Sequence, residues 1–295
     1  MKLIIKQFTL LLLVLSLFAC KSTGLKIGNF DVGKLVDQGV KVWDANHIDQ
    51  KQEVQFGKNM SAVLLGTREL YPNKNINQYV NQVGMWLAAN SSRPDLPWRF
   101  GVINSYSINA FAAPGGYVFI TVGMLEKLES EAQLAAVLAH EIIHVTQKHY
   151  LKALKNSSMR GAITETLFMS AQAYQNNTGA SANDQQYRAW AKKITLATQD
   201  IYSKGLDKED EYQADKQGML LLAKSGYDAY ALIDNLQLLA SIAADDASLA
   251  LLYKTHPSAN QRLEAVSQQA DQLSNVNGLS LVNRYKKRMK ILISP

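Results

Sequence analysis

Two stretches in the first third of the chain repeat apolar residues at intervals of three and four. They run from about Asp49 to Leu65 and from Asn73 to Ala89, where Tyr79 and Val83 continue the repeat. This spacing matches the 3.6-residue period of a helix with one buried face. The two stretches therefore predict two amphipathic helices.

Three short runs after these helices are apolar and β-prone rather than helical. They span Trp98 to Ile103, Asn109 to Ala113 and Tyr117 to Thr121, and Pro114-Gly115-Gly116 separates the last two with the composition of a hairpin turn. A small antiparallel sheet is predicted here. Because the chain from Ser130 onward indicates helix and loop, the predicted fold class is α+β, predominantly α-helical.

The most informative helix begins near Ser130. Ser130 and Gln133 have the spacing of a capping box, and an apolar run follows at once. From Leu134 to Val145 every residue is apolar except two histidines and one glutamate. A helix that is apolar on all sides is a buried helix, so these three polar side chains need partners.

The three polar residues are His140, Glu141 and His144. Histidines four apart share one helix face and can direct nitrogens at the same metal ion. Glu141 lies on the flank of that face, better placed to reach an attacking water than the metal. The alternative is a core helix whose histidines bond to neighbouring side chains.

A catalytic zinc needs a third protein ligand and an open fourth position. Tyr150 and Gln147 stand where a metzincin would carry its third histidine and a glycine, which excludes that class. His149 lies about 140° round a continuous helix from His144. We therefore expect His149 to be a structural or surface residue.

An acidic segment downstream supplies a candidate for the third ligand. It begins at Asp207, a predicted N-cap, and ends at Gly226, with Glu211, Asp215 and Gly218 on one face. By itself, an acidic helix start is typical of a solvated turn that favours the helix dipole. With the histidine pair upstream, the sequence predicts Glu211 as a metal ligand and Asp215 as the partner of a ligand histidine's second nitrogen. Gly218 predicts close helix packing.

These motifs together resemble the prenyl-protease-type (HtpX/BepA/LoiP-like) gluzincin zinc metallopeptidases, which include bacterial lipoproteins. The resemblance covers roughly Gln50 to Gln269, and the family's Glu-x-x-Ala-Asp motif stands here as Glu211 to Asp215. It implies one Zn²⁺ per chain and polypeptide substrates that pair with an open strand edge. An extended peptide can add main-chain hydrogen bonds to such an edge whatever its sequence. The implied substrate-binding residues are Asn109, Ala110, Phe111, Ala112 and Ala113.

A late segment, Thr255 to Arg262, resembles the family's His-Pro motif with a following arginine. The resemblance implies that His256 is either a regulatory fourth ligand or an oxyanion stabiliser. The alternative is a loop histidine before a helix that starts at Pro257. Arg262 is expected either to steady developing negative charge or to bond a helix end.

The N-terminus predicts export. Residues 1–19 carry Lys2 and Lys6, then an apolar run too short to span a bilayer, and end in a small residue, as a signal peptide does. Cys20, the only cysteine, stands where a lipobox would be cut, so we expect it to be lipidated. The alternative is an ordinary thiol beside a cleavage site.

Composition and charge set the remaining boundaries. With 47% hydrophobic and 19% charged residues, the 295-residue chain can bury one main core, and its net charge of +6 is too mild to imply nucleic acid. We expect a linker at 20–45 and a zinc metallopeptidase domain at 46–275. Within that domain, 156–204 is either a lid or a surface helical hairpin, and 276–295 is a basic tail, either solvated or facing anionic lipid.

The predicted function is a zinc-dependent endopeptidase that acts on envelope proteins, in quality control or outer-membrane protein assembly. Lys21 after the cysteine resembles the sorting pattern of outer-membrane lipoproteins facing the periplasm, which suggests the outer-membrane assembly machinery as a partner. The alternative is a periplasmic chaperone or assembly factor whose zinc site is closed or little used.

Overall fold

The computed structural model describes residues 48–156, 192, 195–196, 198–243, 245–272 and 277–293, and the backbone of 26–27 and 30–31. The chain divides into two units, Met1–His47 and Ile48–Pro295. In the first unit, β1 (Lys26–Ile27) pairs antiparallel with β2 (Phe30–Asp31). The predicted signal segment, Cys20 and most of the predicted lid lie outside the described residues.

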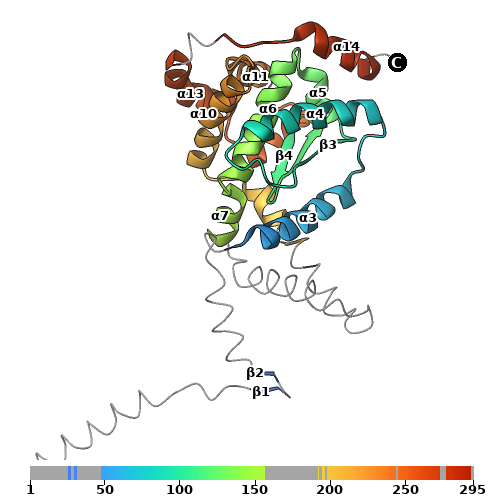
Figure 1. Cartoon of the computed structure of the whole chain (residues 1–295), viewed down its shortest axis with the longest axis vertical. Coiled ribbons are helices and arrows are strands. Elements are labelled where there is room, and N and C mark those ends of the chain that lie inside the picture. The colour runs from blue at the N-terminus through green and yellow to red at the C-terminus, as the bar shows by residue number, and fades with distance from the viewer. Residues whose placement is uncertain are drawn as a thin grey trace, which may run out of the picture. The chain divides into compact units, whose positions relative to one another are not determined.

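The second unit consists mainly of helices around one small sheet, which confirms the predicted fold class (Figure 1). Its helices in the first half are α3 (Gln50–Thr67), α4 (Lys74–Asn90), α5 (Val122–Lys127), α6 (Glu131–Thr146) and α7 (His149–Asn156). Those in the second half are α10 (Lys208–Lys224), α11 (Ala231–Ser241), the 3₁₀ turn η1 (Ala247–Leu249), α12 (Leu252–Thr255), α13 (Ala259–Gln272) and α14 (Val282–Ile293). Among the described residues, no helix combines the length and apolar character that a membrane crossing needs.

Polar side chains cap three of the predicted helix starts. The Asp49 carboxylate accepts from the Gln52 backbone to begin α3, and the Asn73 side chain does the same for α4. Ser130 begins α6 by accepting from the Gln133 amide. Asp207 stands at the N-cap of α10 without a side-chain cap bond.

The sheet is mixed, whereas the sequence predicted an antiparallel one. β4 (Ala110–Ala113) and β5 (Tyr117–Thr121) form the expected antiparallel hairpin, whose turn holds Gly115 and Gly116 at positive φ. β3 (Arg99–Ile103) instead pairs parallel with β5, giving the order β3-β5-β4. The chain leaves the sheet after β3 and returns as β4 on the far side of β5, so β4 becomes an edge strand.

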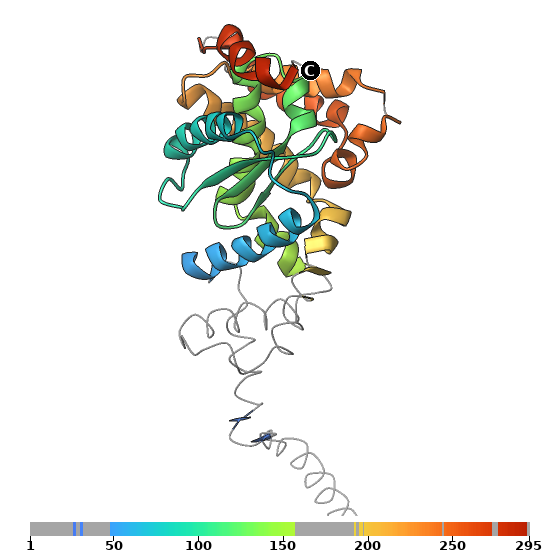
Figure 2. The same ribbon diagram turned by 90° about the vertical axis from the view of Figure 1, so that its right-hand side faces the viewer.

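Helices cover both faces of the sheet, which is why its strands are almost wholly buried (Figure 2). Ile103, Phe111 and Phe119 form one face, against which leucines of α3 and the ring of Tyr202 pack. α4 and α6 contact the sheet as well, and Phe100 of β3 lies against Gly84 of α4. The sheet thereby fixes the position of α6.

α6 is the buried helix that the sequence predicts, and it ends abruptly. The backbone amide of Gln147 closes the last turn on Ile143, and Lys148 then adopts a positive φ of 58°. Such a left-handed residue is uncommon outside glycine and redirects the chain. α7 therefore starts at His149 in a new direction.

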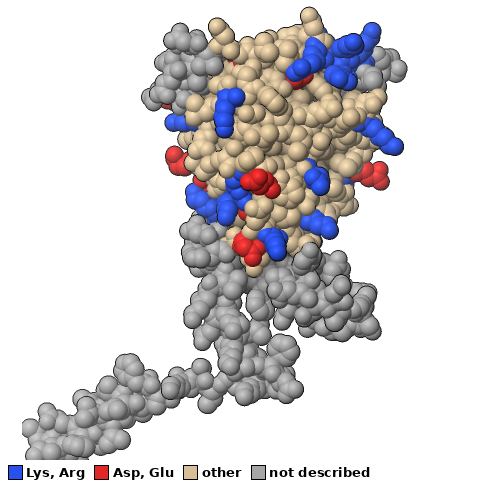
Figure 3. All heavy atoms as spheres, viewed as in Figure 1, with Lys and Arg blue, Asp and Glu red and all other residues tan. Residues whose placement is uncertain are grey.

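The segment predicted as a basic tail forms α14, which is docked on the molecule. Tyr285 and Met289 are buried, and the Tyr285 hydroxyl donates to the Leu125 carbonyl at 2.6 Å. Arg284 donates to the buried carboxylate of Glu131. The remaining basic side chains gather on the outer surface of the helix (Figure 3).

Candidate metal centre

Four buried side chains converge at the centre of the second unit. His140 and His144 come from α6, Glu211 from α10, and His256 from the residue that ends α12. One donor atom from each lies within 4.8 Å of the others. The structure thus brings together the predicted ligands and the histidine of the late motif.

The spacing of these donors fits a single zinc ion. The Nε2 atoms of His140 and His144 lie 2.9 Å apart, and the Glu211 oxygens lie 3.6 Å and 3.4 Å from them, respectively. Ligands at zinc's usual bond length of about 2.0–2.1 Å sit roughly 3.3 Å apart in a tetrahedron. Glu211 Oε1 is buried without a hydrogen-bond partner in the described part of the chain. A cation between the donors would satisfy it.

His256 completes a four-donor group. Its Nδ1 lies 2.7 Å from Glu211 Oε2, and its ring packs 5.4 Å from the His140 ring, centroid to centroid. The side chain is buried, because α12 ends there and the backbone turns into the extended conformation before Pro257. With zinc bound, His256 would supply a fourth protein donor, where a catalytic site keeps a position for water or substrate.

The outward nitrogen of His140 faces a carboxylate. Its Nδ1 lies 2.8 Å from Asp215 Oδ1, one helical turn after Glu211. The guanidinium of Arg262 in α13 donates to both oxygens of the same carboxylate, at 2.8 Å and 2.5 Å. Arg262 also lines the hollow beside Glu141, and its contact with Asp215 is one that the sequence did not predict.

The outward nitrogen of His144 faces another histidine, which sequence reasoning missed. His144 Nδ1 lies 2.9 Å from Nδ1 of His149, which is 2% exposed and whose Nε2 reaches Gln213 Oε1 at 2.9 Å. The expected 140° separation assumed a continuous helix. The turn at Lys148 ends α6 first and returns His149 to His144.

Glu141 is buried beside these groups and has an unpaired oxygen. No hydrogen-bond partner of its Oε2 is found among the described residues. Burial raises the pKa of Glu141, and the nearby charges of His140 and His256 only partly oppose the rise. A carboxylate in this state is suited to accept and return a proton.

Two further ionisable groups, His140 and Glu211, are held in charged pairs. Burial and Arg262 lower the pKa of His140, but Asp215 and Glu211 outweigh them and raise it to about 9. Burial alone would raise the pKa of Glu211, yet His256, His144 and His140 hold it well below its usual range. The lowered pKa keeps Glu211 an anion, whereas the raised pKa of Glu141 suits a base.

The predicted substrate edge, β4, lies beside the site and is partly occupied. The Asn109 carbonyl accepts from Thr121 of β5, so by strand alternation Ala110 and Ala112 point their backbone groups to the free edge. The Asn109 side chain accepts from the Ala110 amide, and the Tyr202 hydroxyl donates to the Ala112 carbonyl at 2.7 Å. The Tyr150 hydroxyl contacts the Ala112 backbone as well. Within the described part of the chain, the free edge thus keeps the Ala110 carbonyl as an open acceptor.

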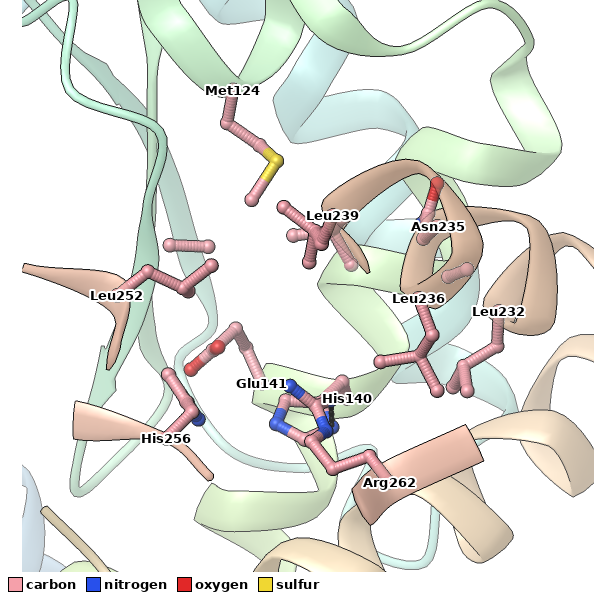
Figure 4. Close-up of a pocket in the computed structure, with 13 residues that line it drawn as sticks. Met124, His140, Glu141, Leu232, Asn235, Leu236, Leu239, Leu252, His256 and Arg262 are labelled. Atoms are coloured by element: carbon pink, nitrogen blue, oxygen red, sulfur yellow. Dashed lines mark hydrogen bonds between the residues drawn. The ribbon is translucent and has the colours of Figure 1, made fainter. Parts of the chain in front are cut away.

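An apolar hollow opens next to Glu141 (Figure 4). Met124 lies at one end of it and His140 and Glu141 at the other, with leucines of α11 and α12 between them. Its volume is about 40 Å³, which holds roughly three water molecules. Ala110 of β4 lines the same hollow.

One helix carries histidines four apart, and a later helix carries a glutamate that faces both imidazoles. A buried glutamate, with one oxygen unpaired among the described residues, follows the first histidine. This arrangement defines a gluzincin-type zinc metallopeptidase. The chain belongs to peptidase family M48, whose family model matches residues 74–270. That range includes all four converging side chains.

Similar proteins agree with this family. The chain is 31% identical over 222 residues to the beta-barrel assembly-enhancing protease of Escherichia coli O157:H7, covering 75% of this chain and 44% of that protein. It is 28% identical over 264 residues to the protein of that name in Yersinia pestis, covering 88% and 51%. The mitochondrial metalloendopeptidase OMA1 of Arabidopsis thaliana is 25% identical over 181 residues, covering 61% and 33%. The chain spans about half the length of the two bacterial relatives.

Proposed function

We propose that this protein is a zinc-dependent endopeptidase in which His140, His144 and Glu211 hold the metal and Glu141 is the general base. The observation that carries the proposal is a pair of buried carboxylate oxygens, on Glu141 and Glu211, that find no hydrogen-bond partner among the described residues and lie beside converging imidazoles. A buried acceptor left without a hydrogen bond costs about 1–3 kcal/mol. A metal ion and a water would satisfy both oxygens.

Each protein group has one task in this mechanism. Zinc, when bound, supplies a Lewis acid that polarises the scissile carbonyl and acidifies the attacking water. Glu141 accepts the proton of that water and returns it to the leaving amine. Asp215 holds His140 by its outer nitrogen, and Arg262 fixes Asp215.

His256 regulates access in this proposal. Its bond to Glu211 makes it the fourth donor in the described conformation, so a substrate carbonyl enters only when His256 swings away. Once displaced, the imidazole lies near enough to donate to developing negative charge. The two roles implied by the family resemblance are then successive rather than exclusive.

The substrate is an extended polypeptide that pairs with β4. The backbone groups of Ala110 and Ala112 supply the pairing, while the hollow above Glu141 receives an aliphatic side chain of the substrate. A volume of about 40 Å³ suits a valine or leucine better than an aromatic ring. Neither contact demands a particular full sequence, as suits a protease acting on many unfolded chains.

The substrates we propose are proteins of the bacterial envelope. Two of the named relatives are beta-barrel assembly-enhancing proteases, which links this family to outer-membrane protein assembly. A lipid on Cys20 would tether the enzyme to the outer membrane on its periplasmic side, within reach of the assembly machinery. Outer-membrane strands that fail to pair are extended and rich in aliphatic residues, which is the chemistry that β4 and the hollow accept.

The test is Glu141→Gln in the full-length protein. Zinc content measured by atomic absorption should stay at one per chain, while cleavage of an unfolded β-barrel substrate falls by roughly 10²–10⁴-fold. Glu126→Gln, an exposed acid on α5, is the matched control and should change neither. Full cleavage by the Glu141 variant would refute the assignment.

A second candidate function is a periplasmic assembly factor with a closed site. The contact between His256 and Glu211 favours it, because four protein donors leave the metal no open position. Complementation of a deletion strain separates the two. Full rescue by Glu141→Gln would favour the assembly factor, and loss of rescue the peptidase.

A further inference from the structure

The two histidines of α6 differ in what supports them. His140 is held by Asp215, the carboxylate expected behind a metal ligand. His144 is held by an imidazole, that of His149, and the two Nδ1 atoms lie 2.9 Å apart. Between two ring nitrogens only one can carry the hydrogen, so the bond has a direction that must be set.

The far side of His149 sets that direction. His149 Nε2 faces Gln213 Oε1 at 2.9 Å and Asp210 Oδ1 at 3.8 Å, and both of these oxygens accept hydrogen bonds. Nε2 must therefore carry the ring hydrogen, which leaves Nδ1 of a neutral His149 as an acceptor. His144 then donates from its own Nδ1, and its Nε2 lone pair points at Glu211 and the proposed metal.

We propose that His149 and Gln213 are positioning residues that fix the tautomer and ring orientation of His144 for zinc. This inference rests on the proposed function, because it takes His144 as a ligand. His149 is the first residue of α7, and the turn at Lys148 places its ring. Gln213 stands two residues after Glu211 on α10. The same helix therefore supplies a proposed ligand and the first member of the hydrogen-bond relay from Gln213 through His149 to His144.

A neutral relay suits the charges already present. Glu211 lies 3.4 Å from His144 Nε2, and a second carboxylate in the place of His149 would repel it in this buried site. The nearest acid on this side, Asp210, is instead paired with Lys152 at 2.6 Å. The imidazole provides a hydrogen-bond acceptor without adding negative charge.

The test compares zinc binding by variants of the full-length protein. His149→Leu removes the acceptor, and we expect its zinc dissociation constant, measured by chelator competition, to rise by about 10–100-fold. His149→Asn places an amide oxygen near the lost Nδ1 and should recover most of the affinity. Gln213→Leu should weaken zinc binding in the same direction but less, because His149 itself stays in place.

Gln217→Leu is the matched control. Gln217 lies one turn after Gln213 on α10 and bonds Gln147, the residue that ends α6, at 3.0 Å, so its substitution removes a glutamine contact of the same helix that does not involve His149. Its zinc affinity should equal that of the wild type. The rise in melting temperature on adding zinc is the second readout, since a merely structural role of His149 would lower the metal-free and zinc-bound values equally.

Two results would overturn the inference. Wild-type zinc affinity in His149→Leu would show that His144 needs no relay, and so would equal losses of melting temperature with and without zinc. Failure of the proposed function gives a different pattern, in which His144→Ala itself binds zinc as tightly as the wild type. Circular dichroism of each variant verifies that it is folded.

Discussion

Gly57 and Gly66 of α3 stand in opposite surroundings. A Cβ added at Gly57 would lie 1.6 Å from the carbonyl oxygen of Pro114, whereas one at Gly66 would meet nothing within 4 Å. The backbone of α3 thus rests directly on the hairpin turn that ends β4. This contact fixes the strand that we propose receives substrate.

Gly57→Ala should therefore destabilise the fold, because backbone atoms on both sides must move. We expect a loss of about 1–3 kcal/mol or more in the free energy of unfolding, as for other overpacked sites. Gly66→Ala in the same helix should be neutral or gain up to about 1 kcal/mol from helix propensity. Urea denaturation followed by circular dichroism measures both, and equal midpoints would contradict the packing argument.

Gly218 shows a milder case of the same effect. The sequence predicted that close packing requires glycine there, and a Cβ would lie 3.5 Å from the His140 amide and 3.3 Å from a Leu232 methyl. These are tight contacts with little overlap, and a leucine methyl can shift. α10 packs closely on α6, but a glycine is required less strictly at Gly218 than at Gly57.

The backbone groups on the free edge of β4 are partly occupied by hydrogen bonds from within the chain. Tyr202 packs its ring on Phe111 and donates its hydroxyl to Ala112, so it takes the acceptor that a paired peptide would use. Edge strands left open are sites of unwanted pairing, and a side chain across the edge prevents it. A substrate must displace this hydroxyl to pair fully.

Tyr202→Phe should consequently tighten substrate binding while keeping the ring in place. One net hydrogen bond is worth about 0.5–1.5 kcal/mol, so KM for an unfolded substrate should fall by roughly two- to tenfold, with kcat little changed. Tyr230→Phe is the control, since its hydroxyl donates to the Ala270 carbonyl at 2.9 Å and neither residue lines the hollow or belongs to β4. An unchanged or raised KM in Tyr202→Phe would argue against pairing at Ala112.

The centre ties together three segments that are far apart in the chain. α6, α10 and the end of α12 each contribute, so a bound metal acts as a cross-link through the middle of the molecule. Without it, Glu211 and the three imidazoles must be satisfied by one another. We therefore expect zinc to contribute to the stability of the whole second unit.

Removal of zinc by a chelator should lower the melting temperature. At a zinc concentration 100 times the dissociation constant, binding contributes about 2.7 kcal/mol. For a domain of this size that corresponds to roughly 5–11 °C. Differential scanning calorimetry should show recovery on adding zinc back, the same shift in Glu141→Gln, and almost none in Glu211→Gln. A chelator-insensitive wild type would contradict a metal at this place.

The amino-acid sequence alone specifies the parts of this protein that depend on local spacing. α3, α4, α6 and α10 start and end close to where periodicity and caps predicted. The positions of His140 and His144 on one face follow from helix geometry, as does the shared face of Glu211 and Asp215. A helix repeats the same way wherever it lies, so these features need no knowledge of the rest of the fold.

Other features arise only when distant segments meet. β5 lies between β3 and β4, and Arg262 grips Asp215, because the chain returns to the same place from far along the sequence. α6 ends at a lysine in a left-handed conformation, with no glycine to signal it, and so His149 turns back onto His144. Local preferences are too weak to fix such contacts, and the packing of the folded chain supplies the free energy that holds them.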